Sequence, residues 1–152
     1  MKFDVVRMKV SAARSKIVSV VITTLISGLL ASIPVPANAA ACDSTETIIG
    51  TDSVVSFTTS ETCTWTVPTG VTSARVLVVG GGASGSAGIS NYYWPAGGGG
   101  GEVKDQTGFS LTPGADISVV VGAGGDATTS SSGNNGTASS FGTITSNGGL
   151  TN

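Results

Sequence analysis

The chain has 152 residues, 11% of them charged, and it contains 23 glycines, two cysteines and no histidine. The absence of histidine removes the commonest general base and metal ligand, and two cysteines are too few for a zinc site built from thiolates alone. This composition gives no support to catalytic or metal-binding residues, and the length suits one small domain.

Residues 1–39 have the three parts of a secretory signal peptide. Five basic residues lie among the first sixteen, an uncharged and mostly apolar run covers 17–33, and the tripeptide Ala-Asn-Ala follows. This order predicts a signal-peptide helix that is cut between Ala39 and Ala40, so we expect a secreted or cell-surface protein that meets a membrane only through this segment. An uncleaved anchor is the alternative, but a bilayer span needs about 20 apolar residues, and serines and threonines interrupt this run.

Cys42 and Cys63 are expected to form a disulfide. An exported chain folds in an oxidising environment, and two cysteines allow a single intramolecular pair. Such a bond stabilises a fold by about 3 kcal/mol on the chain-entropy estimate, and here it would pin the N-terminal tail to the first strands. The alternative is lipidation of Cys42, but the residues before it are alanines rather than the usual large aliphatic residue.

Removal of residues 1–39 changes the charge balance. Two basic residues, Arg75 and Lys104, then stand against eight acidic residues, which gives a net charge of −6. Affinity for phosphates comes from clustered lysines and arginines, so a nucleic acid or an anionic membrane surface is disfavoured as a partner.

The rest of the chain has the pattern of an all-β domain. Residues 40–52 form a polar lead-in, and a glycine-rich β domain follows over 53–152, in which no segment has helical periodicity. The run over 73–79 is the most apolar, which favours burial on both faces or a central place in a sheet. The expected strands are 53–59, 62–67, 73–79, 108–111, 116–121 and 141–146.

Glycine is concentrated between these strands. Twenty of the 23 glycines lie between Gly80 and Gly149, in runs such as 97–101. Because glycine loses the most backbone entropy on folding, such runs are either disordered linkers or segments that pack where a Cβ has no room. They stand at strand ends inside one domain, which favours packed backbone.

Gly80, Gly82 and Gly85 follow the strand over 73–79 with the G-x-G-x-x-G spacing of a dinucleotide-binding loop. That loop must open a helix of about a dozen residues, and Pro95 and the glycine run leave no room for one. A dinucleotide-binding enzyme fragment is therefore only a remote alternative. We expect a protein without enzymatic activity and without a bound cofactor.

Several short motifs, taken in order, resemble the glycine-rich domain family, whose members occur in bacterial secreted and surface proteins and in phage tail proteins. A related region lies in the ectodomain of the anaplastic lymphoma kinase receptor. The resemblance covers about 54–149 and implies a small β-sandwich or jelly-roll-like body with glycine-rich loops or short polyglycine II segments. The matching motifs are Thr64-Trp65-Thr66-Val67-Pro68, Gly70-Val71-Thr72, Arg75-Val76-Leu77-Val78-Val79, Gly80-Gly81-Gly82, 97–101 with Glu102-Val103, Leu111-Thr112-Pro113-Gly114, 119–125 and 139–142.

Tyr92, Tyr93 and Trp94 lie between two glycine runs. They are interpreted first as a hydrophobic plug that caps the domain or covers the sheet. The second interpretation is an exposed tip that binds a glycan or a receptor, because tyrosine and tryptophan dominate binding hot spots. Asp116 and Asp126 are interpreted as solvated acidic residues, because no local pattern supplies a calcium ligand set.

Asn135-Gly136-Thr137 fits a glycosylation acceptor, but Asn-Gly also marks a tight turn, which we favour. The function we expect is that of a secreted or cell-surface structural or adhesive module. The ligand, the mode of attachment, the oligomeric state and the choice between Met1 and Met8 as the start stay open.

Overall fold

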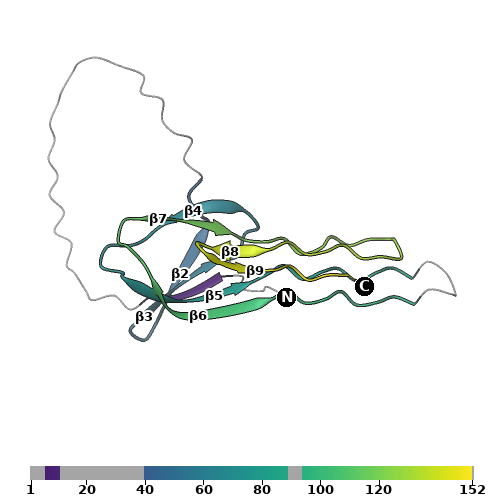
Figure 1. Ribbon diagram of the computed structural model, residues 1–152, viewed down its shortest axis with the longest axis horizontal. Coiled ribbons are helices and arrows are strands. Elements are labelled where there is room, and N and C mark those ends of the chain that lie inside the picture. The colour runs from purple at the N-terminus through teal and green to yellow at the C-terminus, as the bar shows by residue number, and fades with distance from the viewer. Residues whose placement is uncertain (1–5, 11–39, 89–93, 152) are drawn as a thin grey trace, which may run out of the picture.

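The computed structural model describes residues 6–10, 40–88 and 94–151, and every regular element within them is a β-strand. The predicted all-β class is therefore confirmed, as two small antiparallel sheets (Figure 1). The strands are β1 Val6–Val10, β2 Ser44–Ile49, β3 Asp52–Phe57, β4 Thr62–Thr66, β5 Ser73–Val79, β6 Val103–Ser110, β7 Asp116–Val120, β8 Ser139–Phe141 and β9 Ile144–Ser146.

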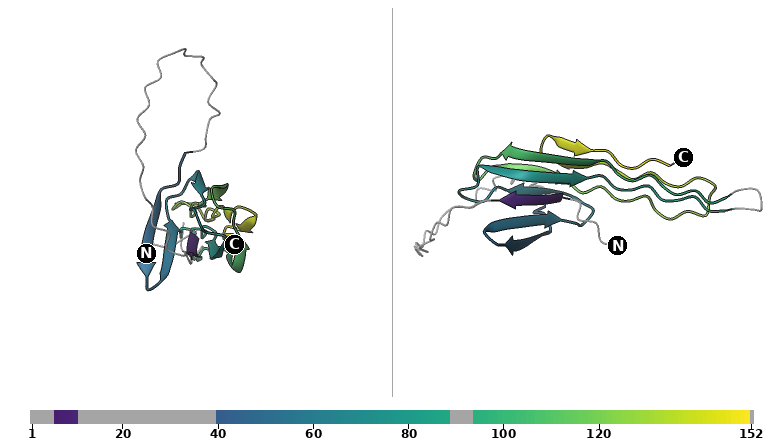
Figure 2. Two further views of the ribbon diagram at one scale, coloured as in Figure 1. Left: turned by 90° about the vertical axis from the view of Figure 1, so that its left-hand side faces the viewer. Right: turned by 90° about the horizontal axis from the view of Figure 1, so that it is seen from below.

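The strand order is β2-β3-β1-β5-β6 in the first sheet and β4-β7-β8-β9 in the second. All of these neighbours pair in the antiparallel sense. Figure 2 shows the two sheets from further sides, with long extended segments leaving them in one direction. The predicted central position of 73–79 is confirmed, since β5 lies between β1 and β6.

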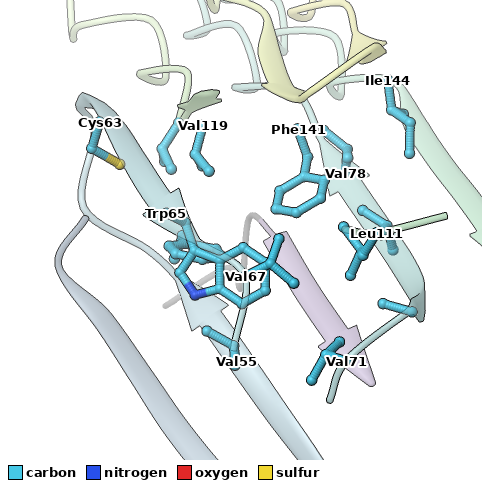
Figure 3. Close-up of a cluster of buried hydrophobic side chains, with 14 residues drawn as sticks. Val55, Cys63, Trp65, Val67, Val71, Val78, Leu111, Val119, Phe141 and Ile144 are labelled. Carbon is cyan, nitrogen blue, oxygen red and sulfur yellow. The ribbon is translucent and has the colours of Figure 1, made fainter. Parts of the chain in front are cut away.

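The hydrophobic core gathers side chains from both sheets (Figure 3). On β5 the residues Ala74, Val76 and Val78 are buried, while the residues between them are more exposed, as the two-residue period of a strand requires. Trp65 stands between two phenylalanines, with its ring centroid 6.4 Å from that of Phe57 and 5.9 Å from that of Phe141. Full burial of a valine or phenylalanine side chain contributes about 1.5–3 kcal/mol to the stability of the fold.

The predicted disulfide between Cys42 and Cys63 is present, with a Cα–Cα distance of 4.9 Å. It joins the segment before β2 to β4, and a parallel bridge between Ala41 and Thr64 lies beside it. The sulfur of Cys42 is therefore in a disulfide, as expected, rather than free for lipidation.

Apart from β1 and small shifts at strand ends, the strands differ from the predicted ones in three places. The polar lead-in contains β2, which pairs with β3 along its whole length. The second difference is in β6, which starts at Val103 rather than at residue 108. The third is the stretch over 141–146, which belongs to a hairpin of β8 and β9 instead of one strand, because Gly142 turns the chain with a φ of +55° that residues with a side chain rarely adopt.

Most of the predicted signal-peptide helix, including the cleavage position at Ala39, lies outside the described residues. Within that segment, residues 6–10 form β1, a strand in the middle of the first sheet. Across the described part of the chain, no helix has the length and apolar character needed to cross a membrane.

Candidate functional site

Five extended segments run side by side away from the sheets and form what we call the glycine bundle (Figure 1). Each continues a strand: the first follows β5, the second leads into β6, the third follows β7, the fourth leads into β8, and the last follows β9. The sandwich therefore sets the spacing at which the segments leave. The segments are 80–88, 94–102, 121–126, 133–138 and 147–151.

Segment 80–88 is the axis of the glycine bundle, and its hydrogen bonds repeat every three residues. The N–H groups of Gly80, Ala83 and Ser86 donate to carbonyls of segment 94–102, each at 2.9 Å. The next residue in each triplet, Gly81, Ser84 and Ala87, donates instead toward Thr137, Asn134 and Ser130, also at 2.9 Å. A polyproline-type helix has three residues per turn and no internal hydrogen bonds, so this pattern identifies packed polyglycine II helices.

Glycine is required where the segments approach one another. A Cβ added to Gly85 would lie 2.7 Å from the carbonyl oxygen of Ala96, and one added to Gly99 would lie 2.7 Å from that of Leu150. At Gly81 and Gly136 the added carbon would overlap neighbouring backbone still more severely. The expectation of packed backbone is confirmed. The tight turn favoured for Asn135-Gly136 is wrong, because this pair lies in an extended segment that packs on Gly81.

Serines extend the glycine bundle rather than interrupting it. The hydroxyl oxygen of Ser84 accepts a hydrogen bond from the N–H of Asn134 at 2.8 Å, and that of Ser86 accepts one from the N–H of Ala96 at 2.9 Å. These side chains satisfy backbone donors that would otherwise need another partner. The bundle is consequently longer than the glycine runs alone.

A family model of the glycine-rich domain matches residues 58–152. The chain belongs to the glycine-rich domain family. The match includes β4 to β9 and the whole glycine bundle, whereas β1, β2 and β3 precede it. Neither the comparison with curated proteins nor that with solved structures finds a match.

The G-x-G-x-x-G stretch of this glycine-rich domain forms backbone hydrogen bonds with neighbouring segments of the same chain. In a dinucleotide-binding loop, backbone N–H groups point at the phosphates and a helix begins there. Here the N–H of Gly80 donates to the carbonyl of Glu102, the N–H of Gly81 donates to that of Thr137, and residues 80–88 stay extended. The glycines serve to pack backbone on backbone.

Segment 94–102 begins at the end of the glycine bundle remote from the sheets (Figure 1), and its first residue, Trp94, is 88% exposed. With a rise of about 3.1 Å per residue, segment 80–88 carries this end about 25 Å beyond β5. Tyr92 and Tyr93 lie outside the described residues. Trp94 is too exposed to cover the sheet, and the tryptophan that packs in the core is Trp65.

The two aspartates considered for calcium have different surroundings. Asp116 lies on β7, where its carboxylate accepts a hydrogen bond from the Thr66 hydroxyl at 2.7 Å. Asp126 stands at the end of segment 121–126, where its backbone carbonyl accepts from the Asn134 amide at 2.9 Å. The part of the chain that the structure describes has no group of three or more histidine, cysteine or acidic residues arranged to hold a metal ion.

Two exposed carboxylates lie where the glycine bundle meets the sheets. The backbone N–H of Asn147 donates to Glu102 at 2.8 Å, and this bond is the main reason that the pKa of Glu102 is lower than usual. Arg75 donates to both oxygens of Asp105, which lowers the pKa of Asp105 and raises that of Arg75. Both groups are thus stabilised in their charged forms.

A cavity of about 900 Å³ adjoins this junction. Its walls are mostly apolar side chains and glycine backbone from β5 and from segments of the glycine bundle. The lining residues include Thr58, Ser60, Leu77, Val79, Val121 and Ala123.

Two buried serines that the sequence did not reveal make structural hydrogen bonds: Ser146 joins the two sheets, and Ser139 joins β8 to segment 121–126 of the glycine bundle. The Ser146 hydroxyl donates to the carbonyl of Val78 at 2.9 Å, and the Ser139 hydroxyl oxygen accepts from the N–H of Gly122 at 3.0 Å. Each lies two positions from a buried apolar residue, Phe141 or Ile144, and so shares its face of the strand. That spacing is the signal that would have found them.

Proposed function

We propose that this glycine-rich domain is exported and works outside the cell as a structural or adhesive module without catalytic activity. The observation that carries the proposal is the three-residue hydrogen-bond repeat of the glycine bundle. Backbone N–H and C=O groups that could have bound a ligand instead form hydrogen bonds between the extended segments. The result is a rod that holds its outer end away from the body.

Other features support an extracellular setting. The first 39 residues have the order of a signal peptide, and the disulfide between Cys42 and Cys63 is stable in oxidising compartments. A charge of −6 after residue 39 keeps the rod from binding nucleic acid or anionic lipid.

The export step is tested with the full chain carrying a C-terminal tag, expressed in a bacterial host with an intact secretion system. We expect tagged protein outside the cytoplasm, with Ala40 as its first residue by N-terminal sequencing. A matched variant with Ala37→Lys and Ala39→Lys should stay uncleaved, because the cleavage site needs small residues. Recovery of the unaltered chain, uncut and in the cytoplasm, would overturn the proposal.

A second candidate function is recognition of a glycan or protein receptor by the segment around Trp94. The observation that favours it is the 88% exposure of Trp94, a large apolar side chain at the outer end of a rod. Exposed aromatic side chains stack on sugar rings and anchor protein interfaces at little cost in conformational entropy.

Fluorescence titration against a glycan panel tests this candidate, with the Tyr92, Tyr93 and Trp94 triple alanine variant as the comparison. Leu150→Ala is the matched control, because Leu150 is also a large apolar residue of the glycine bundle and is 68% exposed. Saturable binding that only the triple variant loses supports a binding tip. Absence of saturable binding leaves the structural role alone.

The remote alternative, a dinucleotide-binding enzyme fragment, is tested with the same purified protein. A flavin absorbance band, or a rise in melting temperature with FAD or NAD, would support it. Neither is expected, because the N–H groups of Gly80 and Gly81 already have backbone acceptors and no helix begins at this stretch.

A further inference from the structure

Among the strands that the structure describes, β1 alone links the two parts of the first sheet, β2-β3 and β5-β6. It pairs with β3 through five residues, from Val6 opposite Phe57 to Val10 opposite Ser53, and with β5 through the same five, from Val6 opposite Val78 to Val10 opposite Ala74. Among the described strands, β3 has no partner on that side other than β1.

Cleavage between Ala39 and Ala40 would remove β1 and leave a gap one strand wide. The β2–β3 hairpin would stay attached through the disulfide of Cys42 with Cys63 and through the ring contact of Phe57 with Trp65. Because β1 is antiparallel to both neighbours, β3 and β5 run parallel and would face each other with open N–H and C=O groups. Such facing edges attract another strand.

The gap has apolar walls. In the register of the sheet, Met8 stands opposite Val55 of β3 and Val76 of β5, and both valines are buried. Val6 stands opposite Phe57 and Val78, which are also buried. A strand placed there would complete the core as well as the backbone ladder.

The cavity of about 900 Å³ continues the gap. Phe57 and Val78 flank the first residue of β1, and Thr58 and Val79, the next residues along β3 and β5, line the cavity. Leu77 adds an apolar wall. The cavity therefore adjoins the end of the gap at which β1 begins, and we call the gap together with this cavity the channel.

Charge favours a basic occupant. The segment that fills the gap alternates apolar and basic residues, Val-Arg-Met-Lys-Val, and the remainder after residue 39 carries a charge of −6. Opposite net charges increase the rate at which such a peptide reaches its site.

We propose that the channel between β3 and β5 is a strand-binding site for an extended, basic peptide with apolar residues at alternate positions. Residues 6–10 occupy it in the uncut chain. Once they are removed, a segment of the same chemistry from another polypeptide binds there, antiparallel to β3 and β5. Only this second step rests on the proposed export.

The test starts from the full chain with protease recognition sequences inserted after Ala13 and after Ala39. After cutting, we expect the fragment over 1–13 to co-elute with the domain in size-exclusion chromatography, at one to one by native mass spectrometry. A fluorescent peptide of residues 1–13 should then exchange into the site and saturate it. Amide hydrogen exchange in β3 and β5 should be slow only while a peptide is bound.

Two control peptides separate strand addition from charge attraction. Met8→Pro should bind at least tenfold more weakly, because proline donates no hydrogen bond to a ladder and is excluded from central strands. A peptide with scrambled order keeps the charge and should also lose at least tenfold.

Loss of the fragment without rebinding of the fluorescent peptide would overturn the proposal. If the domain then stays folded, β3 has closed on β5; if it unfolds, β1 is an ordinary structural strand. Binding of the scrambled peptide as tight as that of the original would also overturn it. These measurements use purified protein, so a failure of export leaves their outcome unchanged.

Discussion

The backbone of Gly101 lies against the backbone of Gly80, where the two meet at the base of the glycine bundle. An added Cβ on Gly101 would overlap the carbonyl oxygen, the carbonyl carbon and the Cα of Gly80, all of which are backbone atoms that cannot turn aside. An added Cβ on the neighbouring Gly100 meets nothing within 4 Å. Of these two adjacent glycines, Gly101 has no room for a side chain, whereas Gly100 has room for one.

Gly101→Ala is expected to destabilise the protein by about 3 kcal/mol or more, since overpacking against fixed backbone forces the segments apart. Gly100→Ala is the matched control. It should leave stability unchanged or raise it by about 0.4–1 kcal/mol, because alanine reduces the entropy of the unfolded chain and the φ of Gly100 is not positive. Urea denaturation of the two variants measures the difference. Equal midpoints would contradict close packing at Gly101.

Removal of the disulfide is expected to lower the free energy of unfolding by about 3 kcal/mol. The reason is that Cys42 and Cys63 join the hairpin of β2 and β3 to the second sheet. Denaturation of the Cys42→Ala/Cys63→Ala variant measures the loss. The single variant Cys42→Ala should behave like the double one, since either change breaks the same link; a single variant as stable as the unaltered chain would refute this role.

Four strands, β3, β4, β5 and β7, were predictable because their signal is local. A near-continuous apolar run marks β5, and the turn residues after Val67 separate it from β4. The close packing of the glycine runs was also predictable in kind, since no other role suits glycine at so many strand ends. A single pair of cysteines left one choice of partner.

The partners within the glycine bundle could not be predicted, because they depend on which strand each segment continues. Gly81 contacts Thr137 only because β5 and β8 lie close in space. The position of a glycine in the sequence does not show whether it packs closely on a neighbouring segment, since an added Cβ on Gly97 or Gly100 would meet open space. A prediction of neighbours requires the sheet order first.

β1 was missed for a related reason. Its alternation of apolar and basic residues suits both the basic start of a signal peptide and a strand. The strand forms only where β3 and β5 offer two facing edges, and these lie more than forty residues further along the chain. Nothing local in residues 6–10 distinguishes the two roles.

The two tryptophans are expected to differ in their access to solvent. Trp94 is 88% exposed and Trp65 is 9% exposed. Trp65→Phe leaves Trp94 as the remaining fluorophore, so iodide should quench most of the emission. In Trp94→Phe the remaining Trp65 should be protected until the protein is unfolded in urea. Strong protection from iodide in the Trp65→Phe variant would show that the tip is covered in solution, against the structure.

Acid is expected to destabilise the protein through Glu102 and Asp105. The pKa of Glu102 is lowered mainly by the backbone N–H of Asn147, and that of Asp105 is lowered mainly by its hydrogen bonds with Arg75. A carboxyl whose pKa is lower in the folded state contributes stability above its unfolded pKa, and it loses that contribution as the pH falls through the folded value. Denaturation midpoints should therefore decline below about pH 4, the usual range of these groups.

The Glu102→Gln/Asp105→Asn variant separates these two groups from the other acids. Both amides keep an oxygen that accepts hydrogen bonds but carry no charge, so the variant should lose less stability than the unaltered chain between pH 5 and pH 2 in the same titration. The effect is small, because both side chains are exposed, and the Asp105 part should shrink further in about 1 M salt, which screens the ion pair with Arg75. Identical acid profiles for the two proteins would show that neither carboxylate is stabilised by its partners.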